Sequence, residues 1–136
     1  MSNFSSKQLL QKALEARRNA YAPYSDYLVG ACLLGKDGQL FTGCNIENAA
    51  FGPSVCAERC AIFKAVSEGC RNFTAIAIVG GPKDTPEEDL APAYPCGVCR
   101  QVMAEFCEPD FQIYCGTPEH PERYTLGELL PKSFGL

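Results

Sequence analysis

The sequence has few of the features that would attach a protein to a membrane or to nucleic acid. No segment approaches about 18 consecutive apolar residues, so no membrane span is predicted. No run of lysine or arginine stands out, and the formal net charge is −4. This balance argues against a partner held mainly by charge, such as nucleic acid or an anionic membrane. The segment MSNFS at the start lacks the charged and apolar regions of a secretory signal, so we expect a cytosolic location.

Histidine is scarce, whereas cysteine is abundant. The one histidine, His120, lies among prolines and acids and is interpreted as a solvated loop residue. Its isolation argues against a hydrolase built on a Ser/His or Cys/His pair. There are nine cysteines, an odd count that does not fit a secreted disulfide scaffold. We expect most of them to be small buried hydrophobes, with a few exceptions that carry chemistry.

The 136 residues predict one domain that spans 1–136, with 46% hydrophobic and 21% charged residues typical of a folded protein. The apolar spacing predicts three helices, which run from a hydroxyl N-cap at Ser5–Ser6 to about Ala20, over Val55–Glu68 and over Gly97–Phe106. Strands are expected at Tyr27–Leu34, Gln39–Cys44, Phe73–Val79 and Phe111–Cys115, and 124–136 is expected to form a short strand and a helical turn. The long segment Gly80–Pro95 is predicted to be a loop.

This alternating order predicts an α/β fold with a mixed sheet and helices packed on its faces. The segment Phe73–Val79 is continuously apolar, which indicates a strand buried on both faces. Tyr27–Cys44 indicates a β-hairpin, because two strand-like runs flank the turn Gly35–Gly38.

Two cysteine-containing segments each begin a predicted helix. They are CAER at 56–59 and PCGVCR at 95–100. Helix N-termini favour thiolates, and two such ends side by side would bring Cys56, Cys96 and Cys99 together. Three thiolates bind Zn²⁺ tetrahedrally and leave a fourth position open, as in catalytic zinc sites. Zinc lowers the pKa of a water at that position, so hydroxide becomes available near neutral pH.

The residues beside the predicted ligands suggest how a proton would move there. Glu58 follows Cys56 by two positions and is the candidate general base and proton shuttle. Three thiolates and a hydroxide would leave the site negatively charged, which opposes ionisation of the water. Arg59, and also Arg100, could offset that charge through N–H···S contacts.

The cysteine motifs are also compatible with other kinds of site. A single C-x-x-C also occurs in zinc ribbons and redox proteins, but a ribbon usually needs a second such pair, which the sequence does not contain. A thioredoxin-like motif would follow the first strand and would give no role to the segment 56–58. Cys60 has helical spacing from Cys56 and is predicted to belong to the core.

Together the two motifs resemble the zinc deaminase signature in its all-cysteine form. More specifically, the chain resembles the small homotetrameric cytidine deaminases of pyrimidine salvage. The stretches that carry this resemblance occur in the family's order and are APYS (22–25), GCNIENA (43–49), CAER (56–59), PCGVCRQ (95–101) and ELLP (128–131). The resemblance implies a three-layer αβα fold with a mixed five-stranded sheet and one Zn²⁺ per subunit.

The resemblance also implies contacts with the substrate. Asn45 and Glu47 match the pair that binds the ribose hydroxyls, and alternate residues of an extended segment point to one side. Tyr27 falls against the pyrimidine ring, and Ala57 is among the substrate-binding positions. Phe51 matches an aromatic that reaches the site of a neighbouring subunit, so a homotetramer with sites at subunit interfaces is implied.

The implied activity is the deamination of cytidine and 2′-deoxycytidine, through attack of zinc-bound hydroxide on C4. Another cytosine-bearing small molecule is an alternative substrate, whereas a polynucleotide is disfavoured because the chain is acidic and lacks a basic channel. A structural zinc module would need a fourth protein ligand. The chain departs from the family at Tyr27, where Phe is typical, at Tyr94, where Ser or Thr is usual, and in the length of the loop Gly80–Ala93.

Overall fold

The computed structural model describes residues 4–136. Residues 1–3 lie outside the described part; they belong to the predicted domain and to the segment MSNFS, for which no secretory signal is predicted. The helices and strands are, in chain order, α1 (Ser6–Arg17), β1 (Tyr27–Gly35), β2 (Leu40–Cys44), α2 (Ala57–Ser67), β3 (Phe73–Pro82), the 3₁₀ turn η1 (Glu87–Asp89), α3 (Gly97–Phe106), β4 (Gln112–Thr117), β5 (His120–Thr125) and α4 (Leu126–Leu129). No helix within 4–136 is long and apolar enough to cross a membrane.

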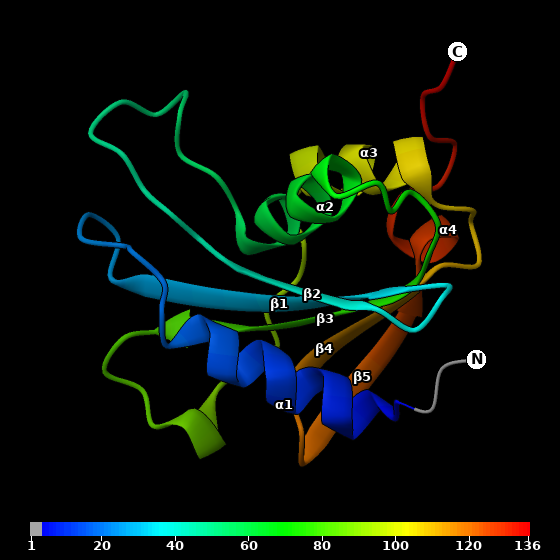
Figure 1. Cartoon of the computed structure of the whole chain (residues 1–136). Helices are drawn as coiled ribbons and strands as arrows, with labels where there is room; N and C mark the ends of the chain where they lie inside the picture. Colours follow the sequence, from blue (N-terminus) through cyan, green and yellow to red (C-terminus); the bar gives the residue numbers. More distant parts are fainter. Residues whose placement is uncertain (1–3) are drawn as a thin grey trace.

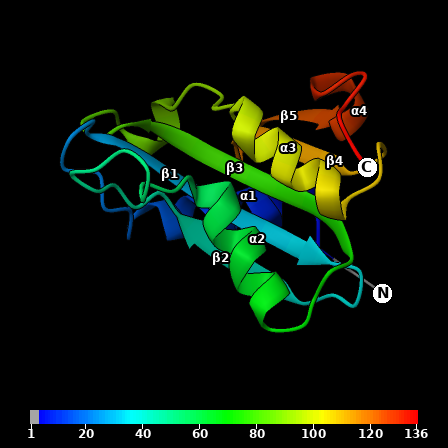
Figure 2. The ribbon, with the colours of Figure 1, turned by 90° about the horizontal axis from the view of Figure 1, so that it is seen from above.

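The strands form one mixed five-stranded sheet in the order β2-β1-β3-β4-β5. β1 is antiparallel to both β2 and β3, β3 is parallel to β4, and β4 is antiparallel to β5. One face of the sheet is covered by α1, and the other by α2 and α3 (Figure 1). Seen from above, α2 and α3 lie side by side over the sheet (Figure 2). The predicted three-layer α/β fold is confirmed.

Each face of the sheet has its own apolar core, because alternate residues of a strand point to opposite faces. On β1, Leu33 packs beneath α2 and α3, whereas Cys32 and Leu34 pack against α1. β3 alternates in the same way, with Ile76 and Ile78 on the α2 side. The prediction that this strand is buried on both faces is confirmed.

Two glycines of the sheet let the helices approach closely. A Cβ at Gly43 would lie 2.6 Å from the carbonyl oxygen of Ala57 and 2.6 Å from the amide nitrogen of Ala61, in the first turns of α2. On the opposite face, a Cβ at Gly30 would lie 2.0 Å from the carbonyl oxygen of Ala13 in α1. These contacts set how deeply each helix sits on the sheet.

Several predicted boundaries were wrong. α1 ends at Arg17 instead of near Ala20, because the next three amides bond to carbonyls three residues back and form a tighter turn. α2 begins at Ala57, two residues after the predicted start. β3 continues past Val79 to Pro82, since its last residues pair with the start of β1. The predicted loop 80–95 therefore begins later, and it contains the turn η1.

The placement of His120 in a loop was also wrong. His120 is exposed, as expected, but it begins β5, which pairs with β4 from Thr117↔His120 to Gln112↔Thr125. The loop was predicted because Pro121 follows His120, and proline is disfavoured in a central strand. An edge strand tolerates it, and β5 is at the edge of the sheet. The helical turn expected near the end of the chain is α4.

The expectation that most cysteines are buried was also wrong. Outside the two motifs only Cys32 and Cys115 are fully buried, whereas four others are half-buried: Cys44, Cys60, Cys70 and Cys107. Within 4–136 all nine are free thiols.

Candidate metal centre and active-site cavity

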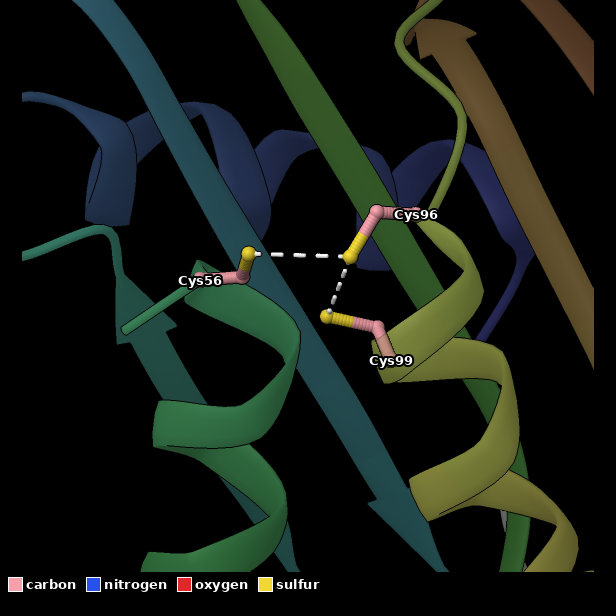
Figure 3. A group of neighbouring side chains, drawn as sticks. All are labelled: Cys56, Cys96 and Cys99. Carbon is pink, nitrogen blue, oxygen red and sulfur yellow. Dashed lines mark hydrogen bonds between the residues drawn. The ribbon is translucent and has the colours of Figure 1, made fainter. Parts of the chain in front are cut away.

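Three cysteine sulfurs converge where α2 and α3 begin. Cys56 is the N-cap of α2, Cys96 is the N-cap of α3, and Cys99 lies in the first turn of α3. Their side chains point toward one another (Figure 3). The Sγ of Cys96 is 3.9 Å from that of Cys56 and 3.5 Å from that of Cys99, and all three sulfurs lie within 4.8 Å of one another. The predicted convergence of these residues is confirmed.

The spacing of the sulfurs fits a tetrahedral zinc ion. Sulfurs bound to Zn²⁺ at about 2.3 Å in tetrahedral geometry are about 3.8 Å apart, and the two closest distances here lie on either side of that value. Thiolates are also the soft ligands that zinc favours. Among the residues that the structure describes, no fourth His, Cys, Asp or Glu joins this group, so one corner stays open.

Arg59 balances the charge of the sulfur cluster. Its Nη2 donates to the Sγ of Cys56 at 3.3 Å. A hydrogen bond from Cys99, together with the Arg59 guanidinium, lowers the pKa of the Cys56 thiol to about 5. The buried Nε of Arg59 has no hydrogen-bond partner within 4–136, which leaves a further donor near the cluster. The predicted N–H···S contact of Arg59 is therefore present.

Arg100 does not make the contact that was considered for it. Its Nε donates to the carbonyl of Pro95 at 2.7 Å, and its Nη1 donates to the carbonyl of Leu129 at 2.7 Å. Arg100 therefore ties the segment before Cys96 to α4, and its hydrogen bonds go to carbonyl oxygens. The spacing of the motif could not predict this, because Leu129 lies far along the chain.

Glu58 is buried beside the cysteines at the start of α2, with only 4% of its surface exposed. Burial raises the pKa of its carboxyl to about 7, and the nearby Cys56 thiolate acts in the same direction. Its own backbone amide and Arg59 act in the opposite direction. A carboxyl with a pKa near neutrality can both accept and release a proton at physiological pH.

A cavity of about 510 Å³ opens above the cluster. Every predicted site residue except Cys99 lines it. Cys99 lies in the first turn of α3 and is fully buried. The lining includes Tyr27, Asn45, Glu47, Phe51, Cys56, Ala57, Glu58, Arg59 and Cys96, together with Ser25, Val29, Ser54, Val55, Ile78, Ala93 and Tyr94. Residues from four distant parts of the sequence thus line one cavity.

Asn45 and Glu47 face this cavity from the extended segment after β2. The Asn45 side chain accepts from the Val29 amide at 2.8 Å and donates to the Tyr27 carbonyl at 2.8 Å, so its orientation is fixed by β1. The Glu47 carboxylate accepts from the amides of Tyr24 and Ser25 at 3.0 and 3.1 Å, and also from the Ser25 hydroxyl. These hydrogen bonds, led by that of the Ser25 hydroxyl, lower the pKa of Glu47 and keep it anionic.

Ser25 is the residue of this site that sequence reasoning missed. It lies in the APYS stretch, but nothing in that spacing shows that it hydrogen-bonds Glu47, 22 residues away. The aromatics differ in exposure: Tyr27 is 40% exposed, which leaves its hydroxyl outside the core, and Phe51 is 95% exposed. Ala57 is fully buried at the cavity floor.

The fold and the site together define a class of protein. A mixed α/β sheet presents two helix N-termini that hold three cysteine ligands, an open corner and a buried carboxyl at the floor of a cavity. This is the architecture of a catalytic, rather than a structural, zinc site.

The comparisons with known proteins identify the family. A family model described as "Cytidine and deoxycytidylate deaminase zinc-binding region" matches residues 4–115. The chain belongs to this family, whose model is that of a zinc-binding region, and Cys56, Cys96 and Cys99 form a group that could hold the zinc ion. A cytidine deaminase from Halalkalibacterium halodurans is 48% identical over 129 residues, which cover 94% of this chain and 92% of the relative.

Solved structures agree in fold. The crystal structure of a cytidine deaminase from Burkholderia pseudomallei matches with a TM-score of 0.85 and 42% identity, and covers 96% of this chain and 100% of that one. A cytidine deaminase structure from Mycobacterium tuberculosis matches with a TM-score of 0.80 and 36% identity, over 98% of this chain and 100% of that one.

Proposed function

We propose that this protein hydrolyses cytidine and 2′-deoxycytidine to uridine and 2′-deoxyuridine, with release of ammonia, in pyrimidine salvage. One observation carries the proposal. The sulfurs of Cys56, Cys96 and Cys99 converge beneath a cavity that the buried carboxyl of Glu58 also lines. The names of the relatives support the same substrate class.

The chemistry needs a nucleophile at C4 of the pyrimidine and a group that moves protons. When bound by the three cysteines, Zn²⁺ supplies Lewis acidity that makes water a nucleophile near neutral pH. Glu58 takes one proton from that water and delivers it to N3 of the ring; it then takes the second proton from the oxygen added at C4 and delivers it to the amino group, which leaves as ammonia. The C4–N bond breaks as C4 gains its oxygen, so water and cytidine become uridine and ammonia. Arg59 stabilises the thiolate charge through its hydrogen bond to Cys56.

The substrate would lie along the cavity with its ribose away from the cysteines. Asn45 and Glu47 bind the ribose hydroxyls, and their hydrogen bonds to the backbone near β1 hold both side chains in place before the substrate arrives. Tyr27 packs on the pyrimidine ring, and Ala57 leaves room for it at the floor. The carboxylate of Glu47 prefers a hydroxyl donor to a phosphate, which favours a nucleoside over a nucleotide.

The predicted homotetramer is part of the proposal, with one domain over 1–136 in each subunit and sites at the interfaces. Phe51 supports it, because this large apolar side chain lines the cavity but is 95% exposed, so its own subunit leaves it unpacked. Phe134, also strongly exposed, lies in the C-terminal segment. The cytosolic location stays a prediction.

Substitution of Glu58 tests the proposed function. We expect Glu58→Ala to keep stoichiometric zinc, since Glu58 is not a ligand, and to lose turnover of cytidine by a factor on the order of 10²–10⁴. Metal analysis and the loss of cytidine absorbance measure the two effects. Glu68→Ala, at the exposed far end of the same helix, is the matched control and should keep both properties. A Glu58→Ala protein with wild-type turnover would refute the assigned role.

A further inference from the structure

A cluster outside the metal centre fastens one wall of the cavity to the edge of the sheet. Tyr94 lines the cavity and is half exposed. Its hydroxyl donates to Oε1 of Glu122 on β5 at 2.8 Å. The hydroxyl of Tyr124 donates to the same oxygen at 2.8 Å. One carboxylate on the edge strand therefore holds two phenols, of which one belongs to the cavity.

Ring packing adds a second restraint on Tyr94. The rings of Tyr94 and Tyr124 meet edge to face, with centroids 5.9 Å apart and planes at 77°. Tyr124 packs in turn on the core beneath α3. The hydrogen bond to Glu122 raises the pKa of both phenols, so both remain protonated donors. Tyr94 is thus fixed at its hydroxyl and at its ring.

The backbone next to Tyr94 is fixed as well. Arg100 links the carbonyl of Pro95 to the carbonyl of Leu129 in α4. Cys96, the next residue, begins α3 and belongs to the metal centre. These links restrain the main chain that follows Tyr94, so its ring forms a restrained part of the cavity wall, two residues from Cys96.

We infer that Tyr94 is a specificity-determining residue that excludes pyrimidines substituted at C5, and that Glu122 and Tyr124 are the positioning residues that hold its ring in place. This inference rests on the proposed function. In that reaction C4 lies at the metal end, and Glu58 serves N3, which is one of the two ring neighbours of C4. The other neighbour, C5, then faces away from Glu58.

Tyr94 and Glu58 line the same cavity but belong to the two different motifs, so in the proposed reaction we assign Tyr94 to the C5 side. Glu58 comes from α2, whereas Tyr94 precedes Cys96 and α3, and these helices lie side by side (Figure 2). A methyl group at C5 would therefore clash with the Tyr94 ring, which its contacts with Glu122 and Tyr124 hold in place. One methyl group in a tight pocket changes selectivity by about 10–200-fold.

The test compares kcat/KM for cytidine with that for 5-methylcytidine. We expect the wild-type zinc protein to favour cytidine, and Tyr94→Ala to lower this ratio by about tenfold or more. Tyr94→Phe and Glu122→Ala keep the aromatic ring at position 94 but remove its hydrogen bond to residue 122, so each should lower the ratio by a smaller factor. The double variant Tyr94→Phe/Glu122→Ala should show no more than the larger single effect, because both changes remove the same hydrogen bond between Tyr94 and Glu122. Glu122→Gln keeps an acceptor and should restore a ratio close to that of wild type.

Arg123→Ala is the matched control, since Arg123 lies between Glu122 and Tyr124 on β5 and its side chain is exposed and contacts Gln112. It should leave the ratio unchanged. An unchanged ratio in Tyr94→Ala, in a protein that still deaminates cytidine, would overturn the specificity role. A ratio that falls in Tyr94→Ala but not in Tyr94→Phe or Glu122→Ala would overturn the positioning role.

Product binding separates this inference from the proposed function. The Kd values of uridine and 5-methyluridine, measured by calorimetry, need no turnover. Their ratio should fall in Tyr94→Ala by a factor similar to that seen in kcat/KM. If the zinc protein bound uridine selectively but never deaminated cytidine, the proposed function would fail while the role of Tyr94 held.

Discussion

Two arginines lie in the two cysteine motifs, Arg59 three residues after Cys56 and Arg100 four residues after Cys96, and they donate to different atoms. Arg59 donates to the sulfur of Cys56, whereas Arg100 donates to the carbonyls of Pro95 and Leu129. Arg59 therefore acts on the charge of the centre, and Arg100 acts on the shape of the segment that carries Cys96. A guanidinium can donate to a thiolate or to carbonyl oxygens, and the acceptors within its reach in the fold determine which bonds it forms.

Removal of the Arg59 guanidinium should weaken zinc binding. Without it the thiolate of Cys56 loses a charge-assisted hydrogen bond, and we expect Arg59→Ala to lower zinc affinity about 10–100-fold. Arg59→Lys keeps the charge but not the planar donor set, so its affinity should fall between the two. Competition with a chromophoric chelator measures the affinity without any need for turnover. Arg71→Ala, an exposed arginine beyond α2, is the control, and equal affinity in all four proteins would contradict this account.

At the level of elements, the metal centre depends on how closely α2 approaches the sheet. Cys56 and Glu58 are held by the first turn of that helix, and Gly43 of β2 lies directly beneath it. A side chain at position 43 would collide with backbone atoms, which cannot move aside as a flexible side chain could. The position of the carboxyl relative to the three sulfurs is therefore set by a glycine outside both motifs.

We expect Gly43→Ala to displace the start of α2 and to lower zinc occupancy of the folded protein. Gly30→Ala should destabilise the protein through α1 on the other face, without a matching loss of zinc by the molecules that remain folded. Each substitution should lower the free energy of unfolding by about 1–3 kcal/mol or more, as overpacking does. Urea denaturation and metal analysis of the soluble fraction distinguish the two effects. Equal zinc occupancy in both variants would show that the approach of α2 does not set the centre.

At the level of the whole molecule, the cavity remains open where Phe51 stands almost fully exposed. If Phe51 completes the site of a neighbouring subunit, sites will be shared between chains. Phe51→Ala should then lower activity and weaken the homotetramer, as measured by light scattering. Apolar contact between subunits would explain both losses.

Mixing the two variants of lowered activity, Phe51→Ala and Glu58→Ala, tests the sharing of sites directly. In an assembly of Phe51→Ala and Glu58→Ala subunits, some sites combine an intact Glu58 with a neighbour's intact Phe51. After dissociation and reassembly, the mixture should be more active than the sum of the separate variants. A mixture with no gain, although light scattering shows mixed assemblies, would place Phe51 in its own subunit's site.

Sequence reasoning reached much of the fold because the signals it used are local. Apolar spacing identified α1, α2, α3 and most strands, since a buried face imposes its period on the chain. It missed the start of β5 and the end of β3, where pairing with a neighbour overrides a weak local preference. Pro121 and Gly81 oppose strand formation locally, but β4 and β1 offer hydrogen bonds that compensate.

The convergence of Cys56, Cys96 and Cys99 near Glu58 was likewise predictable, because the proposed chemistry requires these residue types at short spacing within each motif. The hydrogen-bond partners of Glu47, Arg100 and Tyr94 were not predictable. Their partners, Ser25, Leu129 and Glu122, lie 22, 29 and 28 residues away. Apolar periodicity and the spacing of residues within a motif depend only on neighbours in the sequence, so the sequence by itself determines them. Hydrogen bonds between residues far apart in the sequence form only in the tertiary structure, because the folded sheet brings their elements together.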